Sequence, residues 1–424
     1  MPDPVSLRHR TLPMRGRDPH ERHRPATTLE LLFDLTFVVA FGTAANELAH
    51  NLVEDHVTAG IVGFAFATFG ISWAWINFTW FASAYDTDDW LYRLTTMVQM
   101  VGVLVFALGL PAMFKSIHSG DTLDNDVMVW GYVVMRVAML FQWWRATRQD
   151  TGRRRAHQIY MGSIIASQVL WCVLAIVDLP VTTTFIVMCL PLLIELGGPI
   201  AAERRYGGTP WHAHHIAERY GLMVIIALGE GLIGTMATLT ALSADGLNFD
   251  VAMLAAAGTA VTFGMWWTYF SIPHGEILHA RRDRSFGWGY GHLPLLGAIV
   301  AVGAGLHAAA YFLEDPHHTS LSLVQTVLTV AIPLGAYLIA LYAFYAVVSR
   351  SLDPFHLLLV AGTVIFLVAP VVMAASDVDM IWCLLVLSLA PWMTVVGYEL
   401  HGYRHNAEVL ERLETDRGTR SASN

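Results

Sequence analysis

Apolar residues fall into runs of about twenty residues, the length at which a helix crosses the hydrocarbon of a bilayer, and short polar breaks separate the runs. A lipid-exposed backbone must satisfy its own hydrogen bonds, so each run is predicted to be a helix. Strands of a membrane barrel would be about half as long and polar at alternate positions. The pattern predicts an all-α, polytopic integral membrane protein with about twelve transmembrane helices. The runs cover residues 29–50, 58–81, 94–114, 127–146, 157–177, 181–199, 217–240, 250–272, 291–313, 322–348, 355–374 and 379–400.

Composition favours one membrane domain over several soluble domains. Of the 424 residues, 55% are hydrophobic and only 14% are charged, whereas an average soluble domain has roughly 25% charged residues. Cys172, Cys189 and Cys383 all lie inside apolar runs, so we expect small core residues and no disulfide framework. The net charge of -9 is less informative than the segregation of its sign along the chain.

Basic residues lie almost entirely on one side when successive loops are assigned alternately to the two sides of the membrane. Of the 25 Lys and Arg residues, Lys115 falls in the opposite set of loops and Arg136 lies inside the fourth span. Basic loops stay in the cytoplasm, which predicts an inner-membrane protein with both termini cytoplasmic. Residues 1–26 are predicted to be a retained basic tail, because no compact apolar region with a cleavage site follows their arginines. Residues 404–424 are predicted to be a polar tail.

The two halves of the chain contain similar segments in the same order. FDLTFVVAFG in the first span matches YGLMVIIALG in the seventh, and Gly109-Leu110 in the third matches Gly305-Leu306 in the ninth. A duplicated six-helix unit with small insertions produces such a pattern. Because six spans return the chain to the same side, the two repeats are predicted to be related by a pseudo-twofold axis along the membrane normal. The predicted units are residues 27–211 and 212–403.

Ionisable side chains occur at several depths inside the predicted spans, where each costs about 2.5–3.5 kcal/mol unless it has a partner or water. Structural ion pairs between helices are one interpretation, and a polar pathway is the other, which the spread over inner, middle and outer layers favours. For Arg136, midway along its span, the predicted partner is Glu230 at a similar depth, with Asp34 as the second choice. The candidate pathway residues are Glu30, Asp34, Glu47, Arg136, Glu195, Glu218, Arg219, Glu230 and His307.

The loop after the second span, SAYDTDDWLYRL, is acidic on the side where basic residues are usual. It contains Asp86, Asp88 and Asp89, and Arg93 follows Asp89 by four residues, on the same face of a helix. Three interpretations stay open: a solvated acidic loop, a vestibule that attracts cations, and a salt bridge between Asp89 and Arg93.

The segment WHAHHIAERY places His214 and Glu218 at an i, i+4 spacing that suits a metal ion. No HExxH order or nearby cysteine accompanies the pair, so no metal site is predicted. No cofactor is predicted either, since a P-loop, a GxSxG elbow or a dinucleotide fingerprint is absent from any suitable context. Tryptophans near span ends are interpreted as interfacial anchors; these are Trp73, Trp75, Trp80, Trp143, Trp144, Trp266 and Trp267.

Four segments resemble one protein family: ELLFDLTFVVAF, SWAWINFTWFASAYDTDDWLYRL, HHIAERYGLMVIIALGEGLIG and YGHLPLLGAIVAVGAGLHA. In this order they are similar to the bacterial low temperature requirement A (LtrA) family, over roughly residues 27–400. The resemblance implies a multi-pass bacterial membrane protein. It assigns no mechanism, because the family is named for a growth phenotype.

A transport protein is the leading functional prediction, with an ion or small solute moving along a polar path lined by the first and seventh helices. A membrane-embedded enzyme is the second class; it would gather its reactive groups at one depth, with His214 and Glu218 as the best candidates. A sensor or scaffold linked to cold or stress growth is the third, and its polar residues would be wholly paired. The expected partners are the lipid bilayer and an ion or solute, without nucleic acid, and the oligomeric state is left open.

Overall fold

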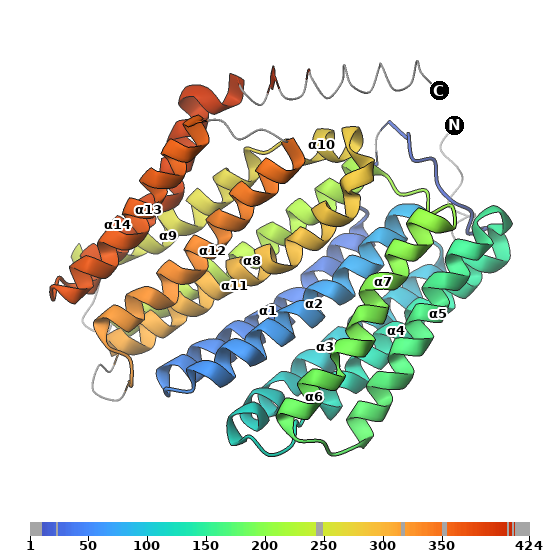
Figure 1. Cartoon of the computed structure of the whole chain (residues 1–424), viewed down its shortest axis with the longest axis horizontal. Coiled ribbons are helices and arrows are strands. Elements are labelled where there is room, and N and C mark those ends of the chain that lie inside the picture. Colours follow the sequence, from blue (N-terminus) through green and yellow to red (C-terminus); the bar gives the residue numbers. More distant parts are fainter. Residues whose placement is uncertain are drawn as a thin grey trace. The chain divides into compact units, whose positions relative to one another are not determined.

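The computed structural model describes residues 11–22, 24–242, 249–314, 319–349, 354–404, 407–408 and 411. Within them the chain folds into helices without a strand, and one isolated bridge joins Thr122 and Pro180. In these ranges, twelve helical segments are long and apolar enough to cross a membrane (Figure 1), which confirms the predicted all-α, multi-pass architecture. The long helices are α1 Thr28–Val53, α2 Val57–Tyr85, α3 Trp90–Ser119, α4 Asp126–Gln149, α5 Arg154–Ile176, α7 Cys189–Arg205, α8 Ala213–Leu242, α9 Phe249–Phe270, α11 Ser285–Glu314, α12 Leu323–Ser349, α13 Pro354–Ala375 and α14 Met380–Gly397, and the short ones include α6 Val181–Val187 and α10 His274–Ala280.

Polar residues determine where two of the helices begin. The side chain of Asp89 accepts a hydrogen bond from the N–H of Tyr92 and caps the start of α3. At the start of α1, the Glu30 carboxylate accepts from the N–H of Thr27 at 2.8 Å, and the Thr27 hydroxyl accepts from the N–H of Glu30 at 3.3 Å. This capping box satisfies backbone donors that have no partner inside the helix. It also fixes Glu30 in the first turn of α1.

The sixth predicted span is broken into two helices. α6 ends at Val187 and α7 begins at Cys189. Pro191 has no N–H to donate to the carbonyl of Val187, and its ring crowds that carbonyl, which accounts for the break. α7 then continues to Arg205, well beyond residue 199, where the apolar run ends.

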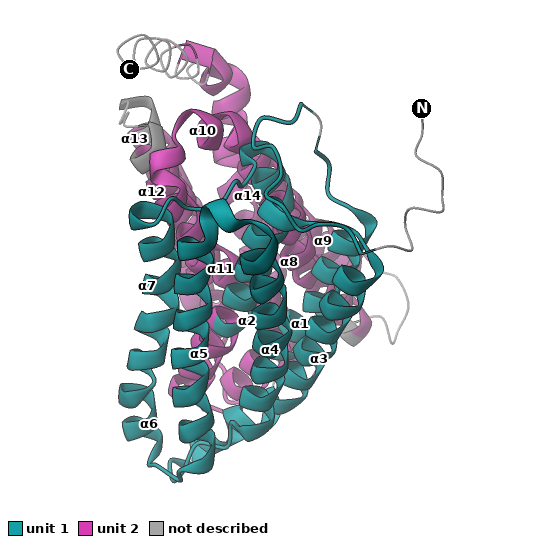
Figure 2. Cartoon of the chain, turned by 90° about the vertical axis from the view of Figure 1, so that its right-hand side faces the viewer, with its two compact units in different colours: residues 1–44, 70–219 teal, residues 45–69, 220–424 magenta. Residues whose placement is uncertain are grey.

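The chain divides into two compact units (Figure 2). Unit 1 comprises Met1–Ala44 and Gly70–Arg219, and unit 2 comprises Ala45–Phe69 and Tyr220–Asn424. Within unit 1, α3 packs on α4, α4 on α5, and α5 on α7. Within unit 2, α11 packs on α12, α12 on α13, and both α13 and α9 on α14. The duplication of residues 27–211 and 212–403 stays a prediction.

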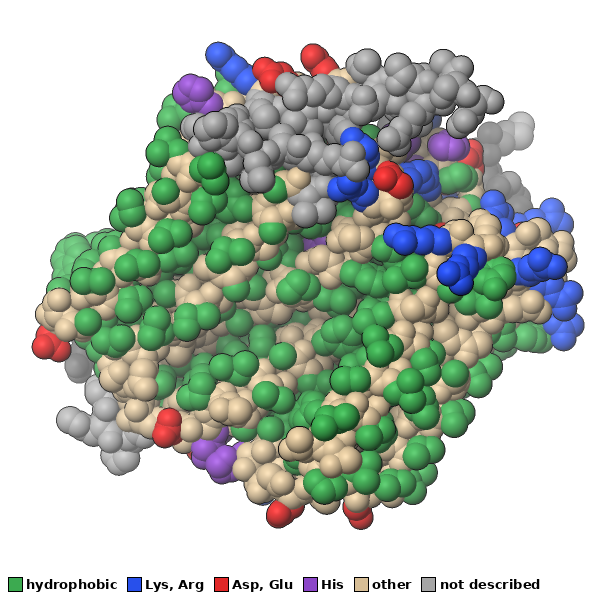
Figure 3. All heavy atoms as spheres, viewed as in Figure 1, with side chains coloured by type: hydrophobic (Ala, Val, Ile, Leu, Met, Phe, Trp, Pro, Cys, Tyr) green, Lys and Arg blue, Asp and Glu red, His purple; other side chains and the backbone are tan. Residues whose placement is uncertain are grey.

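Glycines bring neighbouring helices into close contact in each unit. A Cβ added to Gly109 of α3 would lie 2.3 Å from the backbone nitrogen of Met128 in α4, and one added to Gly305 of α11 would lie 2.3 Å from the carbonyl oxygen of Thr329 in α12. Any larger residue would therefore push these helices apart. Elsewhere on the helices many large apolar side chains are exposed, and hydrophobic side chains cover much of the face seen in Figure 3. Such a surface suits contact with lipid chains.

Candidate functional site

Ionisable side chains from α1 and α8 form a buried cluster in unit 1. Arg219 of α8 donates to both carboxylate oxygens of Asp34 on α1, from Nη2 at 2.5 Å and from Nε at 3.0 Å. The indole N–H of Trp75 in α2 donates to Asp34 at 2.6 Å. Glu30, one turn before Asp34, places Oε1 2.9 Å from Nη1 of the same arginine. One guanidinium group therefore holds two carboxylates.

His215 lies one turn before Arg219 on α8 and faces Glu30. Its Nε2 lies 3.2 Å from Oε2 of Glu30, while its Nδ1 has no hydrogen-bond partner among the described residues. The side chains of Glu30, His215 and Arg219 are fully buried, and that of Asp34 is almost so. At this depth the groups have lost their hydration, so they depend on one another for compensation of charge.

Asp86 and Arg24 extend this cluster outside the membrane spans. Asp86, just after the end of α2, is buried and accepts a hydrogen bond from the N–H of Asp88 at 2.8 Å. Burial, and then the negative charge of Glu30, raise the pKa of Asp86 to about 7. Arg24 donates to two carbonyl oxygens near the end of α2, and its burial lowers its pKa to about 10. The carboxyl of Asp86 therefore exchanges a proton near neutral pH.

A second buried cluster, centred on Glu195 of α7, joins four helices of unit 1. The carboxylate of Glu195 accepts five hydrogen bonds, two of them at 2.9 and 3.1 Å from α5. The donors are Trp73 of α2, Tyr132 and Arg136 of α4, and Ser167 and Gln168 of α5. Here one carboxylate meets one guanidinium group, so the charges cancel and every lone pair of the carboxylate is used.

The sequence-based prediction for the partner of Arg136 is wrong. Arg136 pairs with Glu195, and neither Glu230 nor Asp34 takes that place. In the sequence-based prediction, the depth of each residue is measured from the ends of its apolar run. Glu195 lies near the cytoplasmic end of the run at 181–199. Because α7 continues to Arg205, Glu195 lies deeper in its helix than the run indicates, within reach of a long arginine side chain.

The three aspartates of the acidic loop have different partners. Asp88 pairs with Arg93 at 2.7 Å, and Asp89 pairs with Arg145 of α4, so the predicted bridge between Asp89 and Arg93 is not formed. Asp89 turns away because its carboxylate caps α3. Burial opposes its ionisation, but hydrogen bonds from Arg145 and from backbone N–H groups bring the pKa of Asp89 below its ordinary value. Asp86 and Asp89 are buried, so this loop is not simply a solvated acidic segment.

Comparison with known proteins identifies the family. Residues 25–391 match the family described as bacterial low temperature requirement A protein (LtrA). The chain belongs to the LtrA family. It is also similar to a curated protein of Rhizobium meliloti (strain 1021) that is named only as uncharacterized, with 27% identity over 298 residues that cover 65% of this chain and 67% of the relative. No solved structure matches the chain.

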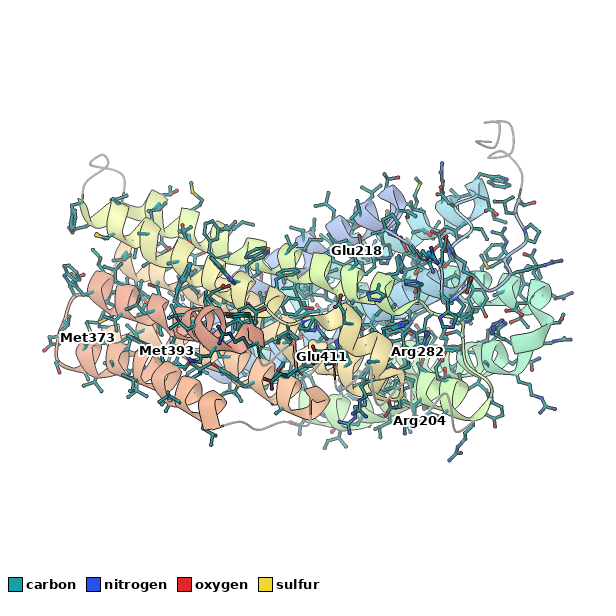
Figure 4. All side chains as sticks on the ribbon, turned by 90° about the horizontal axis from the view of Figure 1, so that it is seen from above. Arg204, Glu218, Arg282, Met373, Met393 and Glu411 are labelled. Carbon is teal, nitrogen blue, oxygen red and sulfur yellow. The ribbon has the colours of Figure 1, made fainter. Side chains whose placement is uncertain are left out.

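The remaining candidate pathway residues of this LtrA-family protein have few partners. Glu47, Glu230 and His307 belong to unit 2; Glu47 is half-buried and Glu230 is buried. Glu218, labelled in Figure 4, lies in the first turns of α8, is exposed, and accepts from the N–H of Ala26 at 3.3 Å. Within the part of the chain that the structure describes, no group of three or more His, Cys, Asp and Glu side chains is placed to hold a metal ion.

Three partners of the candidate residues are not predicted from the sequence: Trp73, Trp75 and His215. The interpretation of Trp73 and Trp75 as interfacial anchors is wrong, because both are buried and their indole N–H groups donate to carboxylates. His215, the neighbour of Glu30, is also unforeseen. A usable signal exists for Glu30 itself, since Thr27 precedes it at the Thr-x-x-Glu spacing of a capping box. For the tryptophans, the signal is chemical: an indole N–H in lipid needs an acceptor.

Proposed function

We propose that this LtrA-family protein transports an ion or small solute across the membrane along a path lined by α1 and α8. The observation that carries the proposal is the cluster around Glu30, Asp34 and Arg219, which is buried and whose fixed charges do not cancel. Intramembrane ionisable groups commonly mark ion pathways and proton relays in transport proteins. The segregation of basic residues supports a cytoplasmic-membrane location with both termini inside.

The charge imbalance follows from the groups present. Three buried carboxyl groups belong to the same cluster as two buried guanidinium groups, so one negative charge is left over when all three carboxyl groups are ionised and the histidine is neutral. The carboxylates belong to Glu30, Asp34 and Asp86, the guanidinium groups to Arg24 and Arg219, and the imidazole to His215. An uncompensated charge at this depth is costly, and one bound proton or monovalent cation removes that cost. A site that gains and loses one positive charge can bias two conformations of a transport cycle.

The other buried ion pairs have the balanced charges expected of a purely structural role. Arg136 matches Glu195, and Arg145 matches Asp89, one positive charge to one negative. A scaffold or sensor would have only such matched pairs, since they hold helices together without an exchangeable charge. The unmatched cluster of α1 and α8 therefore favours transport over a scaffold.

Flux measurements on liposomes that contain the purified protein test this proposal. Uptake of protons, of monovalent cations and of small organic solutes is compared for the wild type, Glu30→Gln and the control Leu35→Ala. Glu30→Gln keeps the shape of the side chain and removes the excess negative charge, while Leu35 is 57% exposed on the same helix. We expect flux by the wild type and the control, and its loss in Glu30→Gln. Folded wild-type protein that moves none of these solutes, or full flux in Glu30→Gln, would refute the proposal.

A further inference from the structure

Glu230 is a buried carboxyl group in unit 2, in the middle of α8. It is only 2% exposed. It packs on α11, where a Cβ added to Gly303 would lie 2.7 Å from the Cβ of Glu230. The next residue, Gly231, meets α9, where an added Cβ would lie 2.5 Å from the hydroxyl oxygen of Thr262. Glycines thus bring three helices close together around this carboxyl group.

The carboxyl group of Glu230 has no hydrogen-bond or ion-pair partner among the described residues. Glu195 offers the contrast within the same chain, since it is equally buried but accepts five hydrogen bonds and pairs with Arg136. An ionised carboxylate without donors or a counter-charge is far more costly to bury than a neutral acid. The arrangement around Glu230 therefore suits the neutral acid, whereas that around Glu195 suits the ionised form.

His307 is the neighbouring titratable group. It lies one turn after Gly303 on α11 and contacts α8 at Gly234, one turn after Glu230: a Cβ added to Gly234 would lie 3.1 Å from Cδ2 of His307. Its Nε2 is buried and has no hydrogen-bond partner among the described residues. α9 contributes the hydroxyl of Thr262 at this level, without an ionisable group. The carboxyl group of Glu230 and the imidazole of His307, both able to carry a proton, therefore lie one turn apart along the contact between α8 and α11.

We infer that Glu230 is a proton-binding site in the membrane interior and that His307 is the group with which it exchanges that proton. A metal ion fits less well, because hard cations take about six or more oxygen ligands and the carboxyl group supplies two. A proton that passes from the Glu230 carboxyl to the imidazole leaves a carboxylate and an imidazolium, two opposite charges one helical turn apart along the contact of α8 and α11. The inference rests on the proposed transport function in one respect: it names the proton as the transported or coupled ion.

Infrared spectroscopy and carbodiimide labelling of the full-length purified protein test the proton on Glu230. A protonated carboxyl group gives a carbonyl band that a carboxylate lacks, and dicyclohexylcarbodiimide adds to a protonated carboxyl group in an apolar site to form a stable acylurea. We expect Glu230→Gln to remove one acid carbonyl band and the label found on the α8 peptide. The double variant Glu195→Gln/Arg136→Met is the matched control, because it removes both charges of that pair, and its acid band should be unchanged. No label is expected on the α7 peptide of the wild type.

An acid carbonyl band that is the same in folded Glu230→Gln as in the wild type overturns the inference, and so does equal labelling of Glu195 and Glu230. His307→Phe provides the second test, because it removes the exchange partner and leaves the carboxyl group. We expect it to slow the pH-driven loss of the Glu230 band, and an unchanged rate would overturn the assignment of His307. If the band belongs to Glu230 but the wild type moves no ion in liposomes, the proton site stands and the transport proposal fails.

Discussion

Glu195 and Arg136 provide the sharpest test of how the buried charges support the fold. Removal of the carboxylate in Glu195→Leu leaves the guanidinium group of Arg136 buried without a counter-charge, which costs about 3–5 kcal/mol. It also frees four neutral donors, and hydrogen bonds between transmembrane helices are each worth about 0.6 kcal/mol on average. We therefore expect a total loss of about 5–7 kcal/mol in the free energy of unfolding.

Arg136→Met should cost less than Glu195→Leu. The remaining carboxylate keeps four neutral donors, so a loss of about 3 kcal/mol, at the lower end of the range for broken buried pairs, is expected. In the double variant no charge is left alone, and its loss should be smaller than the sum of the single losses by about 3 kcal/mol. Unfolding in detergent, followed by helical circular dichroism, measures all four proteins.

Leu193→Ala is the matched control on α7, because Leu193 is 67% exposed and lies two residues before Glu195. Its stability should be close to that of the wild type. Additive losses in the double variant, or equal losses from the two single changes, would contradict the account of Glu195 as a carboxylate held by one charged and four neutral donors.

Three further predictions concern separate parts of the chain. Asp86 keeps its proton up to about pH 7 in the folded protein but loses it near pH 3.8 in the unfolded chain, so the free energy of unfolding should fall as pH rises from about 4 to about 7. Asp86→Asn should flatten the curve of melting temperature against pH, and curves that stay parallel for the variant and the wild type would contradict this. Gly109→Leu should lower the free energy of unfolding by about 1–3 kcal/mol or more, because a Cβ there would lie 2.3 Å from a backbone nitrogen of α4. Gly197→Leu should be tolerated, because no atom of a neighbouring helix lies within 4 Å of a Cβ added there, and equal melting temperatures of the two variants would argue against the contact. Asp121→Cys should react with an impermeant maleimide only from outside the cell and Thr151→Cys only from inside, and labelling from the same side would remove the fourth span.

The fold follows from the sequence because lipid leaves the backbone few choices. Each apolar run had to become a helix, and the twelve predicted spans correspond to the twelve long apolar helical segments found among the described residues. Helix ends are less predictable, since they depend on single residues. Pro191 breaks the sixth span, and α7 extends to Arg205 because its cytoplasmic end is not required to be apolar.

The partners of the candidate residues are harder to predict than their positions. The spacing of Glu30 and Asp34 places them on one face of α1, and both indeed contact Arg219. Which helix faces which, however, depends on the rotation of each helix, and a span that is apolar on all sides carries little information about rotation. For this reason a prediction from depth alone assigns Arg136 to Glu230 in place of Glu195, and it does not identify Trp75 as a hydrogen-bond donor to Asp34.

The measurement that tests the central claim most directly is the transient current of protein-containing liposomes on a supported membrane after a step in pH or cation concentration. If the cluster of α1 and α8 gains and loses one positive charge during transport, the wild type and Leu35→Ala should give a current that saturates with the activating ion. Glu30→Gln, in which the fixed charges cancel without a bound ion, should give none. A current of equal size in Glu30→Gln would contradict the account, because the excess charge of this cluster would then have no part in transport.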